Sequence, residues 1–414
     1  MKRRDKLPLC VVATQMKAWR KTFLTVDMTS STHEEIICGE SSMEAHMLKI
    51  LCVGRVCLDI IHVCMQFPSE DSTQRSTDYR WQRGGNASNT CTVLSLIGQP
   101  CELLACLSAD EHINFLQNDL HKYKIDYSHC PMINGIGCPV SSIILSLDTG
   151  SRTIIHHNCL PELTLKNFEQ LNLEEYSWIH FEGRHIDVVL LMIQRIDNYN
   201  NSLNCDLAVK NRMPITISVE LESPRSGSRI LNLLSYVDVA FIAKEFAEYL
   251  GFSNMNEVIH NIGQDSKGAI ICAWSEEGAI ARTPCGSIVQ SPAFPPRKVI
   301  DTLGAGDTFN AAALYYLNKS KVEFMHKYKE EAACTNDNQM KDASDNNTAI
   351  KRDVKENLDI RSSEYNRAKF INETVLQQAI KFACCIAGAK VGLRGYDCLD
   401  IISSDILRSN FSEN

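Results

Sequence analysis

The 414-residue sequence lacks three features that would each have placed it in a broad class. It has no apolar run of the roughly 18 residues that a membrane-spanning helix needs. It has no excess of positive charge: the formal net charge is −8, which disfavours a nucleic-acid binder that contacts phosphates. None of its 18 cysteines is arranged as C-x-x-C, which disfavours a zinc site. We therefore expect a protein with no membrane and no nucleic-acid partner.

Neither the amino terminus nor the cysteines point to export. The apolar stretch from Leu7 to Thr14 is too short and too interrupted for a secretory signal. Most cysteines stand singly in apolar runs, as Cys52 does, which is typical of buried free thiols in a reducing compartment. We therefore predict a cytoplasmic protein.

Short apolar runs alternate with helical patterns along most of the chain. The clearest runs lie at residues 49–53, 103–107, 178–182, 215–219, 237–242 and 269–273. Such alternation predicts an α/β fold, with a mostly parallel, doubly wound sheet covered by helices on both faces. Two hairpin-like segments, at about residues 56–81 and 139–157, do not fit that layer. They predict a small separate β element that serves as a lid.

Composition divides the chain into a main domain at residues 49–402 and three segments of different character. Residues 1–48 have no clear period, which predicts a poorly ordered extension. Residues 319–372 contain no Gly or Pro and many Asn, Lys, Asp and Glu. This composition predicts a polar insertion in a surface loop, disordered or loosely helical. Residues 403–414 are expected to form a C-terminal tail.

The strongest chemical signal is the segment DTLGAGDTF at residues 301–309, which opens a helix. The small residues Gly304, Ala305 and Gly306 let backbone N–H groups approach an anion at the helix N-terminus. Asp307 would repel an anion that was merely stored there. It can instead take a proton from a hydroxyl while the amides hold the charge that develops on a transferred phosphoryl group. The segment alone leaves open a tight turn in which Asp307 caps the helix.

A second glycine turn, at residues 84–89, also runs into a helix. Asn86 and Asn89 are three residues apart, so their amides share one helix face and can point together at a polyol. Asp59, on a preceding strand, can accept hydrogen bonds from paired sugar hydroxyls. Taken singly, the two amides could equally be helix caps or solvent contacts.

A third segment, from Ala273 to Gly278, ends a buried apolar strand. Doubly wound sheets bind ligands at the carboxyl ends of their strands, which makes this segment a candidate for a ligand site. Its acidic residues, Glu276 and Glu277, would otherwise be ordinary surface charge.

Together, the segments Gly84–Asn86 and Asp301–Asp307 resemble the two signatures of the ribokinase-like (PfkB) carbohydrate kinases. The longer run at residues 81–89 is similar to the ketohexokinase branch of that family in particular. The resemblance covers roughly residues 49–318 and 374–398. It implies a ribokinase-like three-layer sandwich with a small β lid, the β-clasp.

The resemblance implies ATP-dependent phosphorylation of D-fructose at its 1-hydroxyl, which yields fructose 1-phosphate and ADP, with ATP and Mg²⁺ as cofactors. Two alternatives stay open. One is another kinase of the family, acting on ribose, another ketose or adenosine, because specificity among such sugars depends on the shape of the site. The other is a catalytically inactive protein that binds sugar or nucleotide, which an intact Asp307 disfavours.

The resemblance also assigns individual positions, with Asp307 as the catalytic base. The anion-hole positions are Gly304, Ala305 and Gly306, and the sugar-binding positions are Asp59, Gly85, Asn86 and Asn89. The nucleotide-binding positions are Arg152, Ala273, Trp274, Ser275, Glu276, Glu277, Gly278, Gly304, Cys384 and Gly388.

Two further assignments concern a partner subunit and metal ions. Asp71, in the turn at residues 68–72, matches a lid acid that reaches the neighbour's sugar site in a homodimer formed through the lid. The alternative is a purely structural role, in which Asp71 caps this turn. The N-x-x-E motif that helps to place Mg²⁺ in many relatives is absent from the matching stretch Ala243–Phe246, so the metal ligands stay unassigned. Whether K⁺ binds near Asp301, as it does in this family, also stays open.

Overall fold

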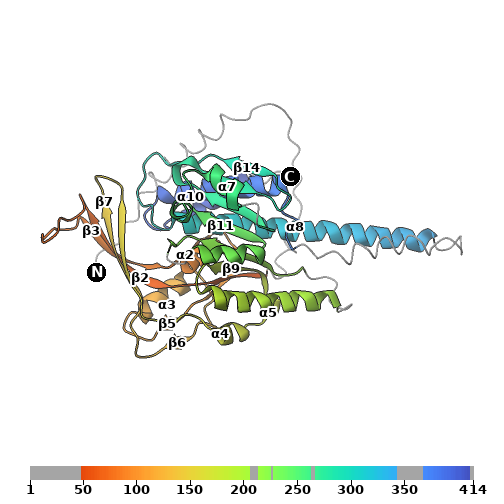
Figure 1. Ribbon diagram of the computed structural model, residues 1–414, viewed down its shortest axis with the longest axis horizontal. Helices are drawn as coiled ribbons and strands as arrows, with labels where there is room; N and C mark the ends of the chain where they lie inside the picture. Colours follow the sequence, from red (N-terminus) through yellow and green to blue (C-terminus); the bar gives the residue numbers. More distant parts are fainter. Residues whose placement is uncertain (1–47, 206–212, 225–226, 263–265, 343–366, 411–414) are drawn as a thin grey trace.

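A mostly parallel eight-stranded sheet forms the centre of the computed structural model (Figure 1). The structure describes residues 48–205, 213–224, 227–262, 266–342 and 367–410, so the predicted extension at residues 1–48 lies outside the described residues except for Leu48. In spatial order the strands are β14 (Ile288–Ser291), β13 (Ala279–Arg282), β12 (Ala269–Ala273), β11 (Val239–Ala243), β10 (Thr216–Leu221), β9 (Tyr176–Glu182), β1 (Lys49–Val53) and β4 (Cys101–Leu104). The strands from β12 to β4 are parallel, and β13 and β14 extend the sheet as antiparallel neighbours.

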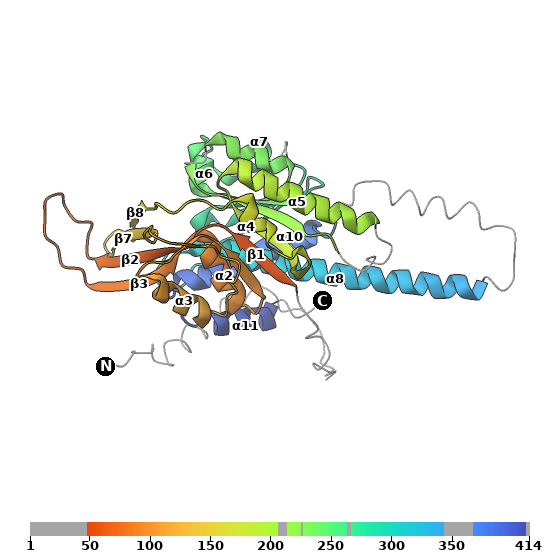
Figure 2. The same ribbon diagram turned by 90° about the horizontal axis from the view of Figure 1, so that it is seen from below.

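Helices cover both faces of this sheet (Figure 2). One layer consists of α2 (Asn86–Leu96), α3 (Ile113–Lys122), α8 (Ala305–Asp342), α10 (Glu373–Val391) and α11 (Leu399–Asn410). The other consists of α4 (Leu165–Glu169), α5 (Ile186–Cys205), α6 (Lys244–Tyr249) and α7 (Met255–Ile262). Strands enclosed in this way are buried on both sides, which is why their sequences are nearly continuous apolar runs. The predicted three-layer, doubly wound α/β fold is confirmed.

A separate four-stranded sheet lies at one end of the central sheet and is called the lid here. Its strands, in spatial order, are β3 (Asp78–Gly84), β2 (Cys57–Cys64), β7 (Val140–Ser146) and β8 (Arg152–His157). A small pair, β5 (Leu107–Ser108) and β6 (Met132–Ile133), lies apart from both sheets. Ile61 and Ile143 of the lid pack on Leu303, which places the lid's inner face against the segment that precedes α8.

The ends of the predicted insertion at residues 319–372 belong to the folded body, so its predicted boundaries are wrong. Helix α8 continues through residue 319 without a break and projects from the body in both views (Figures 1 and 2). Lys321 is 2% exposed and donates hydrogen bonds to the carbonyl oxygens of Ser177 and Pro214, each at 2.7 Å. At the other end Phe370 is buried in the core. Polar composition concealed these contacts, and residues 343–366 lie outside the described residues.

The predicted C-terminal tail at residues 403–414 is also corrected. Residues 399–410 form helix α11, in which Ser403 and Ile406 are buried. The apolar positions Ile402 and Ile406 are four residues apart and therefore lie on one helix face, which packs against the core.

Two features of the described residues concern the predicted free thiols and the expected absence of a membrane-spanning helix. Every cysteine that the structure describes is a free thiol, and most are buried. Among the described residues, no helix combines the length and the apolar character that crossing a bilayer would require.

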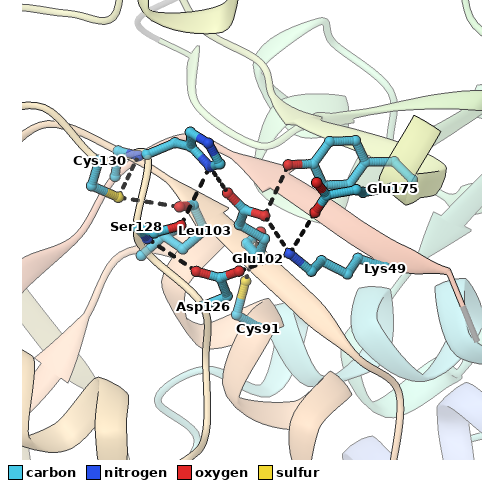
Figure 3. Close-up of polar contacts among 11 residues, drawn as sticks. Lys49, Cys91, Glu102, Leu103, Asp126, Ser128, Cys130 and Glu175 are labelled. Carbon is cyan, nitrogen blue, oxygen red and sulfur yellow. Dashed lines mark hydrogen bonds and ion pairs between the residues drawn. The ribbon is translucent and has the colours of Figure 1, made fainter. Parts of the chain in front are cut away.

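A buried polar network joins the amino-terminal ends of three central strands (Figure 3). The Glu102 carboxylate on β4 is inaccessible to solvent. It accepts hydrogen bonds from Lys49 Nζ at 3.1 Å and Tyr176 Oη at 2.8 Å, and it lies 2.6 Å from His129 Nδ1. Lys49 also lies 2.8 Å from Asp126. These partners come from β1, β4, β9 and the loops between them, so the network holds this edge of the sheet together.

We predict that Glu102→Gln destabilises the fold without impairing the chemistry. The amide keeps the size of the side chain but removes the charge that these donors face, and hydrogen bonds to charged groups contribute about 1.5–3 kcal/mol. Urea unfolding should therefore show a lower midpoint for this variant, and the free energy of unfolding should fall by that amount. Glu169→Gln, at an exposed position of α4, is the matched control and should stay within about 0.5 kcal/mol of wild type. Equal midpoints for the two variants would contradict a stabilising network.

Candidate active site

A cavity of about 640 Å³ is lined by the carboxyl ends of the parallel strands and by the lid. The carboxyl ends of parallel strands meet at one edge of a sheet, and this is where doubly wound folds bind ligands. The structure brings most of the predicted site residues to this one cavity. They are Asp59, Gly85, Asn86, Asn89, Arg152, Ala273, Ser275, Glu276, Gly278, Gly304, Ala305, Gly306, Asp307, Cys384 and Gly388.

Three predicted positions do not line the cavity. Trp274, the first residue after β12, is 2% exposed and packs in the core that α4 to α7 cover. Glu277 is exposed in the short helix η6 (Ser275–Glu277). Asp71 is exposed in the lid turn between β2 and β3, with a positive φ of 54°.

Asp307 lies in the first turn of α8, and its side chain is buried. Asn89 Nδ2 of helix α2 donates a hydrogen bond of 2.7 Å to Asp307 Oδ2. Burial and the nearby carboxylates of Glu222 and Glu182 together raise the pKa of Asp307 to about 8, against the opposing effects of Asn89 and Lys390. A carboxyl group with such a pKa can take up a proton near neutral pH, as a general base must.

The backbone at Gly304 requires a glycine. Its φ is +75°, and a Cβ at this position would lie 2.4 Å from Tyr396 Oη. The turn brings the chain into the N-terminus of α8, where the helix dipole and free N–H groups favour an anion. Gly304, Ala305 and Gly306 all line the cavity, so this helix end faces the space that a ligand would occupy.

Asp59 comes from the lid strand β2 and forms the opposite wall. Its carboxyl group is buried, and Cys57 Sγ donates to its Oδ1 at 3.3 Å. Burial raises the pKa of Asp59 to about 6, so the group is ionised at neutral pH and can accept hydrogen bonds from hydroxyls. A Cβ at Gly84 would lie 2.1 Å from Asp59 Oδ2, which explains the first glycine of the turn.

The two amides predicted to act together have different partners. Asn89 donates to Asp307, as described above, whereas Asn86 donates to Glu222. Both side chains still line the cavity. Their shared helix face was predicted, but the carboxylates that they contact come from distant segments.

Acidic residues at the ends of β9 and β10 are functional candidates that the sequence analysis missed. Glu182 ends β9, and Glu220 and Glu222 lie at the end of β10. Asn310 Nδ2 donates to Glu220 Oε1 at 2.8 Å, and burial raises the pKa of Glu220. The other oxygen of Glu220 has no hydrogen-bond partner in the described part of the chain. Acids in or next to the last residues of buried apolar strands were a usable signal for this site.

The family model described as pfkB family carbohydrate kinase matches residues 47–332. The ketohexokinase of Mus musculus is 36% identical over 354 residues, which cover 84% of this chain and 98% of that protein.

Two solved structures share the fold. The ribokinase of Giardia lamblia has a TM-score of 0.67 at 14% identity, covering 88% of this chain and 99% of that one. The ribokinase of Arabidopsis thaliana, solved with ribose and ATP, has a TM-score of 0.51 at 17% identity, covering 66% of this chain and 86% of that one. These likenesses confirm the predicted ribokinase-like fold.

Proposed function

Because the chain belongs to the PfkB family of carbohydrate kinases, which are phosphotransferases with an alcohol acceptor, we propose that it phosphorylates the 1-hydroxyl of D-fructose with ATP. The observation that carries this proposal is the buried Asp307 carboxyl, bound to Asn89 at the N-terminus of α8. The similarity to ketohexokinase over nearly the whole of that protein supports the choice of fructose.

In the proposed reaction, Asp59, Asn86 and Asn89 hold the sugar hydroxyls. Asp307 takes the proton of the attacking hydroxyl as its oxygen approaches the γ-phosphorus in line. The backbone amides at residues 304–306 stabilise the negative charge of the transferring group. The reaction then yields the sugar phosphate and ADP.

The nucleotide is proposed to lie across the remaining wall of the same cavity. Arg152 of the lid carries a positive charge suited to the phosphates. Gly278, Cys384 and Gly388 form a wall of small residues that a flat base can approach. A side chain at residue 388 would collide with the Phe294 carbonyl oxygen, which lies 2.0 Å from where its Cβ would be.

The lining also fits Mg²⁺ bound together with ATP. Mg²⁺ prefers oxygen ligands and is usually held by one or two carboxylates plus substrate phosphates. The unpartnered oxygen of Glu220 and the neighbouring Glu222 are the residues that would hold it, directly or through water. When bound, Mg²⁺ neutralises charge on the phosphates.

A panel of acceptors tests the proposed substrate. Purified protein with MgATP should release ADP fastest with D-fructose, compared with ribose, a second ketose and adenosine. The phosphorus–proton couplings of the product should show the ester on C1. A higher kcat/KM for ribose or adenosine, or an ester elsewhere on fructose, would overturn the assignment of substrate.

Asp307→Asn is the matched control for this panel. The amide has the same size but cannot accept the proton, and loss of a general base costs about 10²–10⁴ in rate. ATP binding should survive. The variant also reveals any contaminating host kinase, because its residual rate is the assay background. Retention of more than about a tenth of wild-type turnover is incompatible with Asp307 as the base.

The pKa of Asp307 predicts a specific pH profile. The base works only when ionised, and its ionised fraction falls below a pKa of about 8. Therefore kcat/KM for the sugar should rise with pH up to about 8 and should fall about tenfold for each pH unit below it. Measurement between pH 6 and pH 9 checks this. A flat profile over that range would mean that the group titrates near its ordinary pKa.

We further propose that the lid pairs with a second copy of the chain, which gives a homodimer. Its outer face carries a row of side chains that are paired across the strands: Trp81, Ile60, Ser142 and Ile155. Trp81 is 40% exposed and Ile155 is 65% exposed. A small sheet with an apolar outer face gains stability by packing against another sheet, and two copies can do so across a two-fold axis. Asp71, at the exposed turn of this lid, could then reach the partner's sugar.

Complementation tests the role of Asp71. Asp71→Ala and Asp307→Asn chains should each be weakly active alone. If Asp71 works in the partner's site, a mixed dimer contains one site with both groups, so mixing should raise the activity. Glu70→Ala, on the same turn, is the control and should stay near wild type. No gain on mixing, or a monomer in sedimentation at working concentration, would exclude this arrangement.

A further inference from the structure

A fully buried lysine lies beneath the turn that forms the anion hole. Lys390, in the last turn of α10, has no solvent exposure. Its ammonium donates hydrogen bonds to the carbonyl oxygen of Asp301, at 3.0 Å, and to that of Leu303. It also lies 3.9 Å from Asp301 Oδ1 and 5.5 Å from the centre of the Tyr396 ring. Two carbonyls, a carboxylate and an aromatic face are what a buried cation needs.

The carbonyl oxygens of Asp301 and Leu303 already accept hydrogen bonds from the Lys390 ammonium, which is a cation of the chain itself. K⁺ would also be bound through carbonyl and carboxylate oxygens, which is the kind of site considered near Asp301. With the Lys390 ammonium in contact with both carbonyls, the residues around Asp301 do not fit a bound K⁺.

Asp301 itself is held from the other side. Its Oδ2 accepts hydrogen bonds from Arg80 of the lid strand β3, at 2.8 Å, and from the Gly395 amide, at 3.1 Å. Its Oδ1 accepts from the Leu303 amide at 3.0 Å. The carboxylate is therefore fully engaged, and among the described residues only Lys390 donates to the two carbonyls. Loss of the ammonium would leave these carbonyls buried without a donor, at a turn that leads directly into Gly304.

We infer that Lys390 is a positioning residue for phosphoryl transfer, and that its ammonium acts as a built-in cation that holds the 301–303 turn and thereby sets the anion hole at residues 304–306. The inference rests on the proposed role of those residues. The ammonium also favours the ionised form of Asp307, whose pKa it lowers. Small displacements of reacting groups can cost about 100-fold in rate.

Replacement of the internal cation by an added one tests this inference. Lys390→Ala removes the ammonium and leaves a space. With whichever sugar the wild type phosphorylates best, kcat should fall about 100-fold, with a much smaller change in KM. Methylammonium or K⁺ at about 0.1 M should bind in the space that the ammonium leaves, about one cation per site. Either cation should raise the kcat of Lys390→Ala about tenfold. Tetramethylammonium, which is too large, controls for ionic strength and should restore nothing.

Two variants keep the test decisive. Lys390→Met fills the same space without charge, so it should lose activity to a similar degree and gain nothing from added cations. Lys321→Met replaces a second buried lysine of the described residues, which lies about 20 Å along α8 from Asp307 at 1.5 Å per residue. It should lower the thermal midpoint and leave kcat unchanged.

Each outcome decides the inference. Loss in Lys390→Met together with cation rescue of Lys390→Ala supports it. A folded Lys390→Ala that no cation rescues, or a kcat of Lys390→Met within a few-fold of wild type, overturns it. If Lys390→Ala does not fold, the kcat of folded Lys390→Met alone decides in the same way. Because the acceptor is chosen from the wild-type panel, a wrong substrate assignment would not be mistaken for failure here.

Discussion

The hydrogen bond between Asn89 and Asp307 joins the first turns of two helices, and the two residues are 218 positions apart in the chain. One helix, α2, follows the glycine turn that contacts Asp59, and the other, α8, follows the turn at residues 301–304. Because both helices begin at the same cavity, their dipoles and first-turn residues act on one ligand space. The sheet, the lid and the layer that contains α2, α8 and α10 all have to be in place for this contact to form.

The electrostatics of the cavity depend on four acidic side chains that lie close to one another. Glu182, Glu220, Glu222 and Asp307 lie around one space, and burial together with mutual repulsion raises the pKa values of Asp307 and Glu220. Such a cluster is costly without positive charge. The chain supplies part of it through Arg152 and the buried Lys390, and the proposed MgATP substrate would supply the rest.

The lid is tied to the turn at residues 301–304, which leads into the proposed anion hole, by several contacts. Arg80 pairs with Asp301, Ile61 and Ile143 pack on Leu303, and Arg152 lies 3.5 Å from Thr302 Oγ1. The position of the lid is thus linked to the turn that opens α8. A second copy packed on the outer face of the lid would in turn restrict its position, which gives a physical reason for the proposed dimer.

The sequence by itself determined the features that depend on neighbouring residues. The alternation of apolar runs predicted the doubly wound sheet, and the two glycine turns predicted where helices begin beside a ligand. The end of the strand at Ala273 was also predicted, but Trp274 was assigned to the site from the family resemblance, and it packs in the core. Tertiary structure decided what depends on distant partners: the carbonyl oxygens that accept hydrogen bonds from the buried Lys321 and Lys390, the open oxygen of Glu220, and the contact of Arg80 with Asp301. The physical reason is that a buried charge is tolerated only with partners, and those partners come from segments that are adjacent only after folding.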